Sequence, residues 1–456
     1  MINIYTTLLT FALVAPLITN AATNDWSDLD KMTRVEVIDR TLRPFSGASN
    51  PGVDTKTLTG KVMSGYQGWF NTPDDGAGRG WVHWSSRGKF EPGACKIDLW
   101  PDVSELDTDE RYGTPFVHED GRKAEVFSSF NRKTVLRHFK WMQDYGLDGV
   151  FVQRFITSTR DTKTLRHVNV VLNNCREGAN LYGRTYAVMY DLSGLGADQM
   201  SRVMDDWKLL VDRMQITKDP AYLQHNGKPV VTVWGIGFND NRKYTLPECL
   251  ELVKFLKDDP KYGGNTVMLG VPTHWRTLSQ DCLGDQMLHD IILKADIVSP
   301  WTVGRYSNPD QVTRYAQRTM KPDLDWCRER NKEFLPVVFP GFSWHNMYSR
   351  SPLNQIPRLK GKFLWTQYTE AKKVGATMVY QAMFDEVDEG TAIFKCTDDP
   401  PIGASRFVDF EGLPSDFYLK LVGQATRMIR GDSYSVESYL KEGGNRAALT
   451  PTSMRN

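Results

Sequence analysis

Short β-rich apolar runs alternate with amphipathic helical stretches over most of this chain, and this rhythm constrains its fold more than any other feature. The runs predicted to be strands are residues 61–66, 149–155, 185–190, 229–234, 266–271, 297–300, 334–339 and 377–381. The stretches predicted to be helices are residues 132–145, 162–180, 197–214, 246–257, 285–293, 310–330, 360–373 and 415–430. Parallel strands need helical crossovers and burial on both faces, so eight such units predict an α/β fold, a closed (β/α)8 TIM barrel.

An open, doubly wound sheet is the alternative arrangement of the same units. It would favour a glycine-rich phosphate loop after a strand, and the sequence has neither a GxGxxG nor a Walker-type motif. The stretch 71–129 is rich in Gly, Pro and Asp, so it predicts a long βα-loop insertion with a short extra strand at 95–100. Trp81 and Trp84 in this loop are candidates for the wall of a cleft.

The N-terminus predicts export. An apolar stretch at residues 8–18 is followed by small residues up to Ala22, as in a signal-peptidase site, and it is too short to span a bilayer. No later run of about 18 apolar residues exists, so no integral membrane segment is expected once the signal is removed. The predicted organisation is a signal peptide (1–22), a lead-in (23–58), the barrel (59–430) and a flexible tail (431–456), in a secreted or periplasmic protein.

Composition narrows the classes of partner. The 456 residues contain 56 Lys and Arg against 55 Asp and Glu, a formal net charge of +1, which argues against nucleic acid as the main partner. With 40% hydrophobic and 24% charged residues the chain is typical of a globular protein, and wholesale disorder is excluded.

The six cysteines are scattered through the sequence. They show no CxxC pair and no neighbouring His at ligand spacing, so neither a zinc site nor any other metal or cofactor is predicted. Up to three disulfides could form in an exported protein, although buried free thiols are the commoner state in a large domain. The Asp-rich stretch 102–110 lacks the glycine and the glutamate spacing of a calcium-binding EF-hand loop and is interpreted as solvated surface.

Polar and aromatic side chains gather where the predicted strands end, which is where a barrel of this kind places its active site. Each could be an ordinary core or ion-pair residue, but their repetition at separate strand ends favours a carbohydrate site, in which aromatic rings stack on sugars and polar groups bind hydroxyls. The candidate substrate-binding residues are Tyr66, Gln67, Trp69, Gln153, Arg154, Tyr190, Asp191, Trp234, His274, Trp275, Trp301, Trp344, His345, Asp385 and Asp388.

The last predicted strand leads into four carboxylates within five residues. Glycosidic bond cleavage commonly uses one protonated and one ionised carboxyl group, and acids packed together have separated pKa values. Glu386 and Glu389 are three residues apart, so one helical turn or a tight loop would place them on one side. The same ExxE spacing also occurs at the acidic N-termini of solvated helices. The position just after the last strand favours the catalytic interpretation.

A known family becomes recognisable in these residues. The stretch Phe384-Asp385-Glu386-Val387-Asp388-Glu389-Gly390-Thr391-Ala392-Ile393 resembles the N-E-W-H-E-G-T-x-I signature of glycoside hydrolase family 99, the endo-α-mannosidases, within the broader 71/99-like group. The turn from Tyr66 to Phe70 and the stretch Pro340-Gly341-Phe342 are also similar to motifs of that family, and the order of units fits from about residue 60 to 430.

The resemblance implies a barrel enzyme that retains anomeric configuration through a 1,2-anhydro sugar, formed by attack of the substrate's own 2-hydroxyl. It assigns Glu386 as the base for that hydroxyl and Glu389 as the general acid and then base, with Tyr66 and Trp69 at the sugar subsites. Four positions depart from the family pattern: Asp385, Val387, Asp388 and Phe342 stand for Asn, Trp, His and Tyr. These changes surround the catalytic pair, so the resemblance supports hydrolase chemistry more strongly than it supports mannose specificity.

The principal functional hypothesis is therefore an exported glycoside hydrolase that acts on a glycan or polysaccharide without a cofactor. A barrel that binds carbohydrate without cleaving it is the alternative from another class. A metal-dependent hydrolase using His274 and His345 is less favoured, because each of these histidines is solitary and no HxH pattern occurs.

Overall fold

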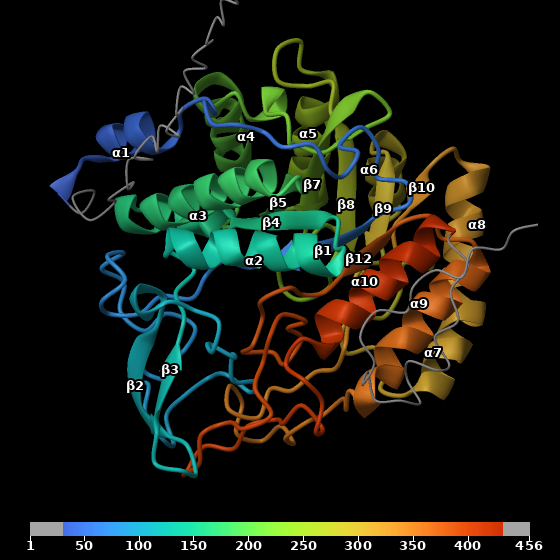
Figure 1. Ribbon diagram of the computed structural model, residues 1–456. Coiled ribbons are helices and arrows are strands. Elements are labelled where there is room, and N and C mark those ends of the chain that lie inside the picture. The colour runs from blue at the N-terminus through green and yellow to red at the C-terminus, as the bar shows by residue number, and fades with distance from the viewer. Residues whose placement is uncertain (1–30, 432–456) are drawn as a thin grey trace, which may run out of the picture.

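The structure of the protein is a computed structural model, and the residues that it describes are 31–431 (Figure 1). A parallel sheet lies at its centre, and its strands in chain order are β1 (Val62–Tyr66), β4 (Gly149–Phe155), β5 (Thr185–Asp191), β7 (Lys228–Trp234), β8 (Thr266–Val271), β9 (Ile297–Pro300), β10 (Glu333–Phe334), β11 (Val337–Val338) and β12 (Val379–Gln381). They are hydrogen-bonded in the order β10-β9-β8-β7-β5-β4-β1-β12-β11, and a two-residue strand, β6 (Gln224–His225), adds to β7.

The sheet closes because its two end strands, β10 and β11, belong to one extended segment. The Leu335 amide still donates to Val298 of β9 at 2.9 Å, whereas the Pro336 carbonyl already accepts from Tyr380 of β12 at 2.9 Å. Pro336 has no N–H to give to a ladder, so the segment changes partner there. Counted as one strand, β10 and β11 complete a ring of eight, and the predicted TIM barrel is confirmed.

Helices surround the barrel in the order that the sequence predicts. They are α2 (Arg132–Tyr145), α3 (Thr162–Leu181), α4 (Ser201–Leu209), α5 (Leu246–Asp258), α6 (Met287–Lys294), α7 (Pro309–Tyr315), α8 (Lys321–Glu329), α9 (Lys362–Val374) and α10 (Phe417–Arg430). The predicted helix 310–330 is divided into α7 and α8 by a π-helical turn at Ala316–Met320, and a similar turn, Leu210–Met214, extends α4. Short 3-10 turns lie at Thr108–Glu110, Ile156–Thr159, Ile216–Lys218 and Leu359–Gly361.

Local sequence explains where these helices begin and end. Asn131 caps α2 by accepting from the amides of Lys133 and Thr134, and Gly146 ends the helix at φ +77°. Thr245 and Glu248 form a reciprocal capping box at the start of α5. Within the barrel, Gly65 leaves room for a neighbouring ring, because a Cβ there would lie 2.1 Å from the Tyr380 hydroxyl.

The loop after β1 differs from its prediction. It contains an antiparallel hairpin, β2 (Tyr112–Val117) and β3 (Lys123–Val126), that the sequence did not indicate. The predicted strand at 95–100 is wrong, since Cys95 forms only an isolated bridge with Ser85. In Figure 1 the hairpin lies beside the segment after β12, and a bridge between Val117 and Ile402 joins them.

Aromatic residues give this insertion a core of its own. Trp84 is fully buried and packs against Phe70 and Phe127, with ring centroids 4.5 and 5.3 Å apart. Trp81 is half-buried against Phe90. These tryptophans therefore stabilise the loop by packing and do not line the cavity described below.

The segments that flank the barrel were predicted to be a signal peptide, a lead-in and a tail. Helix α1 (Arg34–Thr41) lies in the predicted lead-in and packs on α3. The predicted signal peptide and all of the predicted tail except Gly431 lie outside the described residues. All six cysteines are described; each is buried with a free thiol. Within residues 31–431 no helix combines the length and apolar character that a bilayer crossing requires.

Candidate active site

A cavity of about 270 Å³ lies at the carboxyl ends of the barrel strands. Seven of the eight strand positions contribute to it, either with a strand residue or with the loop just beyond, and only β8 does not. This is the end of a (β/α)8 barrel at which active sites form. Its lining residues are Gln67, Gln153, Phe155, Asp191, Ser193, Trp234, Trp301, Trp344, Glu386 and Glu389.

The four carboxylates after β12 lie in a turn rather than in a helix. The Phe384 amide donates to the Gly65 carbonyl of β1 at 2.7 Å, and the Val387 carbonyl accepts from the amides of Asp98 and Leu99. Gly390 adopts φ +66°, and the Glu389 carbonyl accepts from the Ser343 amide at 2.9 Å. The turn is thus fixed to three other segments, and the solvated helix considered for the ExxE spacing does not form.

Glu386 is held by two short hydrogen bonds. Its carboxyl accepts from the Gln67 side-chain amide at 2.6 Å and from the Thr391 hydroxyl at 2.5 Å. The residue is only 3% exposed, and this burial, together with the negative charges of Glu389 and Asp388, raises its pKa well above the usual range. The two hydrogen bonds act against this rise because they favour the ionised form.

Glu389 shares the cavity with Glu386 but has fewer partners. Burial, followed by the charge of Asp388, raises the pKa of Glu389 to about 8, while the indole of Trp344 acts in the opposite direction. Within residues 31–431 the Glu389 carboxyl accepts no hydrogen bond, and the nearby indole nitrogen of Trp344 is itself left without a partner. The pKa of about 8 favours a protonated Glu389 at neutral pH, whereas the two hydrogen bonds on Glu386 favour the ionised form of that residue.

The other two acids of the turn lie behind the cavity. Asp385 is fully buried and accepts from the backbone amides of Gln67 and Gly68, both at 2.8 Å; burial raises its pKa to about 7. Asp388 is also buried and lies 2.8 Å from Nδ1 of His83. The His83 ring stacks on Trp69 at a centroid distance of 3.8 Å and an angle of 5°. These acids orient the loops around the cavity without lining it.

The cavity wall is aromatic and carries unpaired polar atoms. Trp234 and Trp301 contact edge to face, with centroids 5.6 Å apart. Four lining residues carry a buried polar atom with no hydrogen-bond partner among the described residues: the side-chain oxygens of Gln67 and Gln153, and the indole nitrogens of Trp234 and Trp344. Asp191 adds a carboxyl whose pKa burial raises to about 6. A ligand with hydroxyl groups can both donate to and accept from such a wall.

The structure therefore brings together part of the predicted substrate-binding set. Gln67, Gln153, Asp191, Trp234, Trp301 and Trp344 line the cavity with both glutamates. Trp69 lies close behind it, since its ring contacts the lining residue Phe155 at a centroid distance of 5.4 Å.

Three other predicted residues are buried in contacts with the helices. The Tyr66 hydroxyl bonds to His138 of α2 at 2.9 Å. Arg154 forms an ion pair with Asp206 of α4 at 2.6 Å, and the Tyr190 hydroxyl donates to the same carboxylate at 2.8 Å. Neighbouring strand residues face opposite sides, so these three side chains are directed toward the helical layer instead of the cavity.

The predicted histidines and one tryptophan also lie elsewhere. His274 bonds to Asp281 at 2.8 Å, and Trp275 is fully buried against Trp326. Nδ1 of His345 bonds to the carbonyl of Ser351 at 3.0 Å. The two histidines thus have separate partners, and neither lines the cavity.

Sequence reasoning did not identify Phe155, Ser193 or His83. Phe155 ends β4 and Ser193 follows β5 by two residues, so a wider window around each strand end would have included them. His83 comes from the long insertion, where no periodic pattern predicts which residue reaches the acidic turn.

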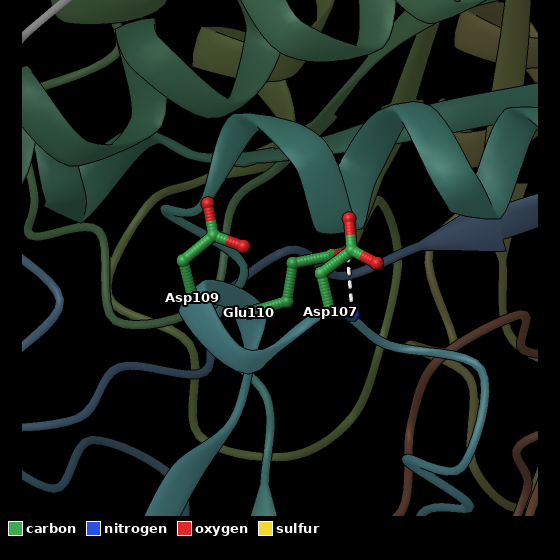
Figure 2. Close-up of side chains that lie close together, drawn as sticks. All are labelled: Asp107, Asp109 and Glu110. Carbon is green, nitrogen blue, oxygen red and sulfur yellow. Dashed lines mark hydrogen bonds between the residues drawn. The ribbon is translucent and has the colours of Figure 1, made fainter.

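One cluster of acids outside the cavity has the geometry of a cation site. The carboxylates of Asp107, Asp109 and Glu110 lie close together beneath α2 (Figure 2). Lys133 of that helix bonds to both aspartates at 3.0 and 2.9 Å, and Arg137 bonds to Glu110 at 2.5 Å. The helix therefore supplies the positive charges that this group requires. The two aspartates are exposed, as interpreted from the sequence, whereas Glu110 is buried.

The fold and cavity define a (β/α)8 barrel with an acidic pocket, and comparisons with known proteins agree on the fold. The structure of the GH99 endo-alpha-mannosidase from Bacteroides thetaiotaomicron is similar, with a TM-score of 0.59, 17% identity, and coverage of 82% of this chain and 99% of that one. A glycoside hydrolase-like protein is similar with a TM-score of 0.51, 13% identity, and coverage of 85% and 99%. No protein-family model and no curated protein matches the chain. The resemblance to family 99 is thus confirmed at the level of the fold.

Proposed function

We propose that this protein is an exported glycoside hydrolase that cleaves O-glycosidic bonds in a glycan or polysaccharide. The observation that carries the proposal is the pair Glu386 and Glu389, which share one aromatic cavity at the carboxyl end of the barrel and differ in their hydrogen bonds. The structural neighbours named as glycoside hydrolases support it. Export rests on residues 1–22, and N-terminal sequencing of secreted protein, expected to begin near Ala22, tests it.

The two glutamates have different roles in a reaction that retains the anomeric configuration. Glu386, ionised and held by Gln67 and Thr391, accepts the proton of the sugar's 2-hydroxyl as that oxygen attacks the anomeric carbon. Glu389, with its raised pKa, donates its proton to the departing glycosidic oxygen. Water then opens the 1,2-anhydro sugar: Glu389 accepts a proton from the water, and Glu386 returns its proton to the 2-oxygen. The product keeps the configuration of the substrate.

Two substitutions with two kinds of substrate test these roles. Glu386→Gln and Glu389→Gln should each lower kcat on a natural glycan by about 10³-fold, because each removes a proton transfer. An aryl glycoside whose leaving group needs no proton should restore turnover in Glu389→Gln but not in Glu386→Gln. Glu251→Gln, at an exposed position of α5, is the matched control.

The outcomes separate the alternatives. The wild-type protein and its variants are screened for activity on α-mannans, other plant and microbial glycans, and aryl glycosides. NMR follows the release of sugar and the anomeric configuration of the product. Activity retained in both glutamine variants would remove the catalytic assignment. Glycan binding without any release by the wild-type protein would instead establish a carbohydrate-binding barrel.

A further inference from the structure

A second cavity, of about 700 Å³, lies among the loops and is larger than the catalytic one. It is lined by Ser86, Arg87, Lys89, His345, Asn346 and Ser405, with six further residues, none of which is Asp or Glu. We call it the basic cavity. The whole chain carries a net charge of only +1, so a lining with Arg87, Lys89 and a histidine but no acid is a local feature and not a reflection of composition.

A tight turn presents two of the basic residues. The backbones of Ser86 and Lys89 exchange hydrogen bonds of 2.9 and 3.0 Å, which closes a two-residue turn at Arg87 and Gly88. Both turn residues have positive φ, +52° and +78°, as a type I′ turn requires. Arginine is uncommon in this conformation, so the position is defined by the turn and not by the preference of the residue.

The charges on this turn are available to a ligand. Within residues 31–431 the Arg87 guanidinium makes no hydrogen bond and no ion pair, and the residue is exposed. Lys89 has a single ionic partner there, Glu91, at 3.4 Å, and both of these side chains are largely exposed. Exposed pairs of this kind are weak and are readily exchanged for another anion.

Another part of the lining is held rigidly. The buried carboxylate of Asp98 accepts from the backbone amides of His345 and Asn346 at 2.6 and 2.8 Å. The Asn346 side chain donates to the carbonyls of Ile97 and Arg406. Nδ1 of His345 donates to the Ser351 carbonyl, which leaves Nε2 without a partner among the described residues. A positioned imidazole whose free Nε2 can accept a hydrogen bond from a sugar hydroxyl thus lies in the same lining as Arg87 and Lys89.

The basic cavity and the catalytic cavity are lined by residues that are neighbours in the sequence. Trp344 lines the catalytic cavity, and the next residue, His345, lines the basic cavity. The loop that carries Arg87 also carries His83, which bonds to Asp388 in the catalytic turn. Two segments of the chain thus join the lining of the basic cavity to the lining of the catalytic cavity and to its acidic turn.

We propose that the basic cavity binds an acidic group of the glycan, a sulfate ester or a uronate carboxylate, and so selects acidic polysaccharides. Guanidinium and ammonium groups form charge-assisted hydrogen bonds with either anion, and Asn346 and the serines can bind the adjoining hydroxyls. This inference rests on the proposed function, since it assumes that the substrate is a glycan. Binding at the basic cavity can nevertheless be measured without turnover.

Calorimetric titration at constant ionic strength tests the proposal with three probes: glucose 6-sulfate, glucuronate and glucose. We expect at least one anionic sugar to bind about tenfold more tightly than glucose. The double variant Arg87→Ala/Lys89→Ala should lose this difference. Lys218→Ala/Lys228→Ala removes the same charge at exposed positions before and at the start of β7, and it should behave as the wild type.

The pattern of binding identifies the group or overturns the proposal. Tight binding of glucose 6-sulfate alone assigns a sulfate ester, and tight binding of glucuronate alone assigns a carboxylate. Equal binding of all three sugars by the wild-type protein, or an unchanged preference in the Arg87→Ala/Lys89→Ala variant with native circular dichroism, contradicts it. Failure of the glutamate variants to lose hydrolysis is a separate result and concerns the proposed function alone.

Discussion

At the scale of single residues, Asp388 links the long insertion after β1 to Glu386 and Glu389. Its negative charge contributes to the raised pKa of both Glu386 and Glu389, and its carboxylate is bonded to His83. One oxygen of Asp388 is buried without a partner, so the residue is poorly stabilised for a purely structural role. The charge of Asp388 thus favours the protonated form of both glutamates, Glu389 included.

Replacing Asp388 with a neutral residue should shift the pH dependence of kcat/KM. Asp388→Asn removes the repulsion, so the pKa of Glu389 should fall and the alkaline limb of kcat/KM should shift to lower pH, by about one unit. Adding His83→Ala to Asp388→Asn should cause no further shift, because His83 acts through Asp388. Asp205→Asn, at an exposed position of α4, is the control. An unchanged alkaline limb in Asp388→Asn would show that Asp388 does not act on Glu389.

At the scale of elements, a buried ion pair joins the barrel to its helical layer. Arg154 of β4 and Asp206 of α4 are 2% and 4% exposed at their side chains, and Asn169 of α3 accepts a further hydrogen bond from Arg154 at 2.8 Å. The Tyr190 hydroxyl adds another bond to Asp206. This network connects two strands and two helices, so Arg154 and Tyr190 contribute to stability rather than to sugar binding.

Removing one member of the Arg154–Asp206 ion pair should lower the free energy of unfolding. Asp206→Ala leaves a buried guanidinium without its counter-charge, and we expect the free energy of unfolding to fall by about 3–5 kcal/mol. The neighbouring Asp205 pairs with Lys208 at an exposed position, so Asp205→Ala should cost less than about 1 kcal/mol. Denaturant unfolding of both variants measures the difference. Equal, small losses would contradict the structural role of the Arg154 network.

How far the sequence predicts these elements depends on whether a repeating pattern exists. The strands β8 and β9 and the helix α2 have the predicted bounds, because continuous apolar runs and helical spacing report burial directly. The hairpin β2 and β3 was missed, since its pairing depends on packing within an aperiodic insertion. Periodicity also cannot distinguish which of two adjacent strand-end residues faces the cavity, as Gln153 and Arg154 show.

The whole molecule contains several carboxyl groups that folding makes harder to ionise. Burial raises the pKa of Asp191 to about 6, of Asp323 and Asp385 to about 7, and of Glu389 to about 8. Each of these groups binds its proton more tightly in the folded than in the unfolded chain. Their contribution to stability is therefore full below the unfolded pKa values, near 4, and is lost as the pH rises through 6 to 8.

The upward shift of its pKa predicts that Glu389 limits the stability of the folded protein in alkaline solution. Glu389→Gln removes a group whose ionisation opposes folding, so at pH 8.5 the variant should unfold at a Tm at least about 2 °C above that of the wild type. At pH 5 Glu389 is protonated in the folded protein, and the two Tm values should nearly coincide. Differential scanning calorimetry at both pH values measures the effect, with Glu251→Gln as the exposed control. A variant less stable than the wild type at pH 8.5 would mean that the carboxylate of Glu389 is stabilised in the folded site, and the general-acid role would lose its electrostatic basis.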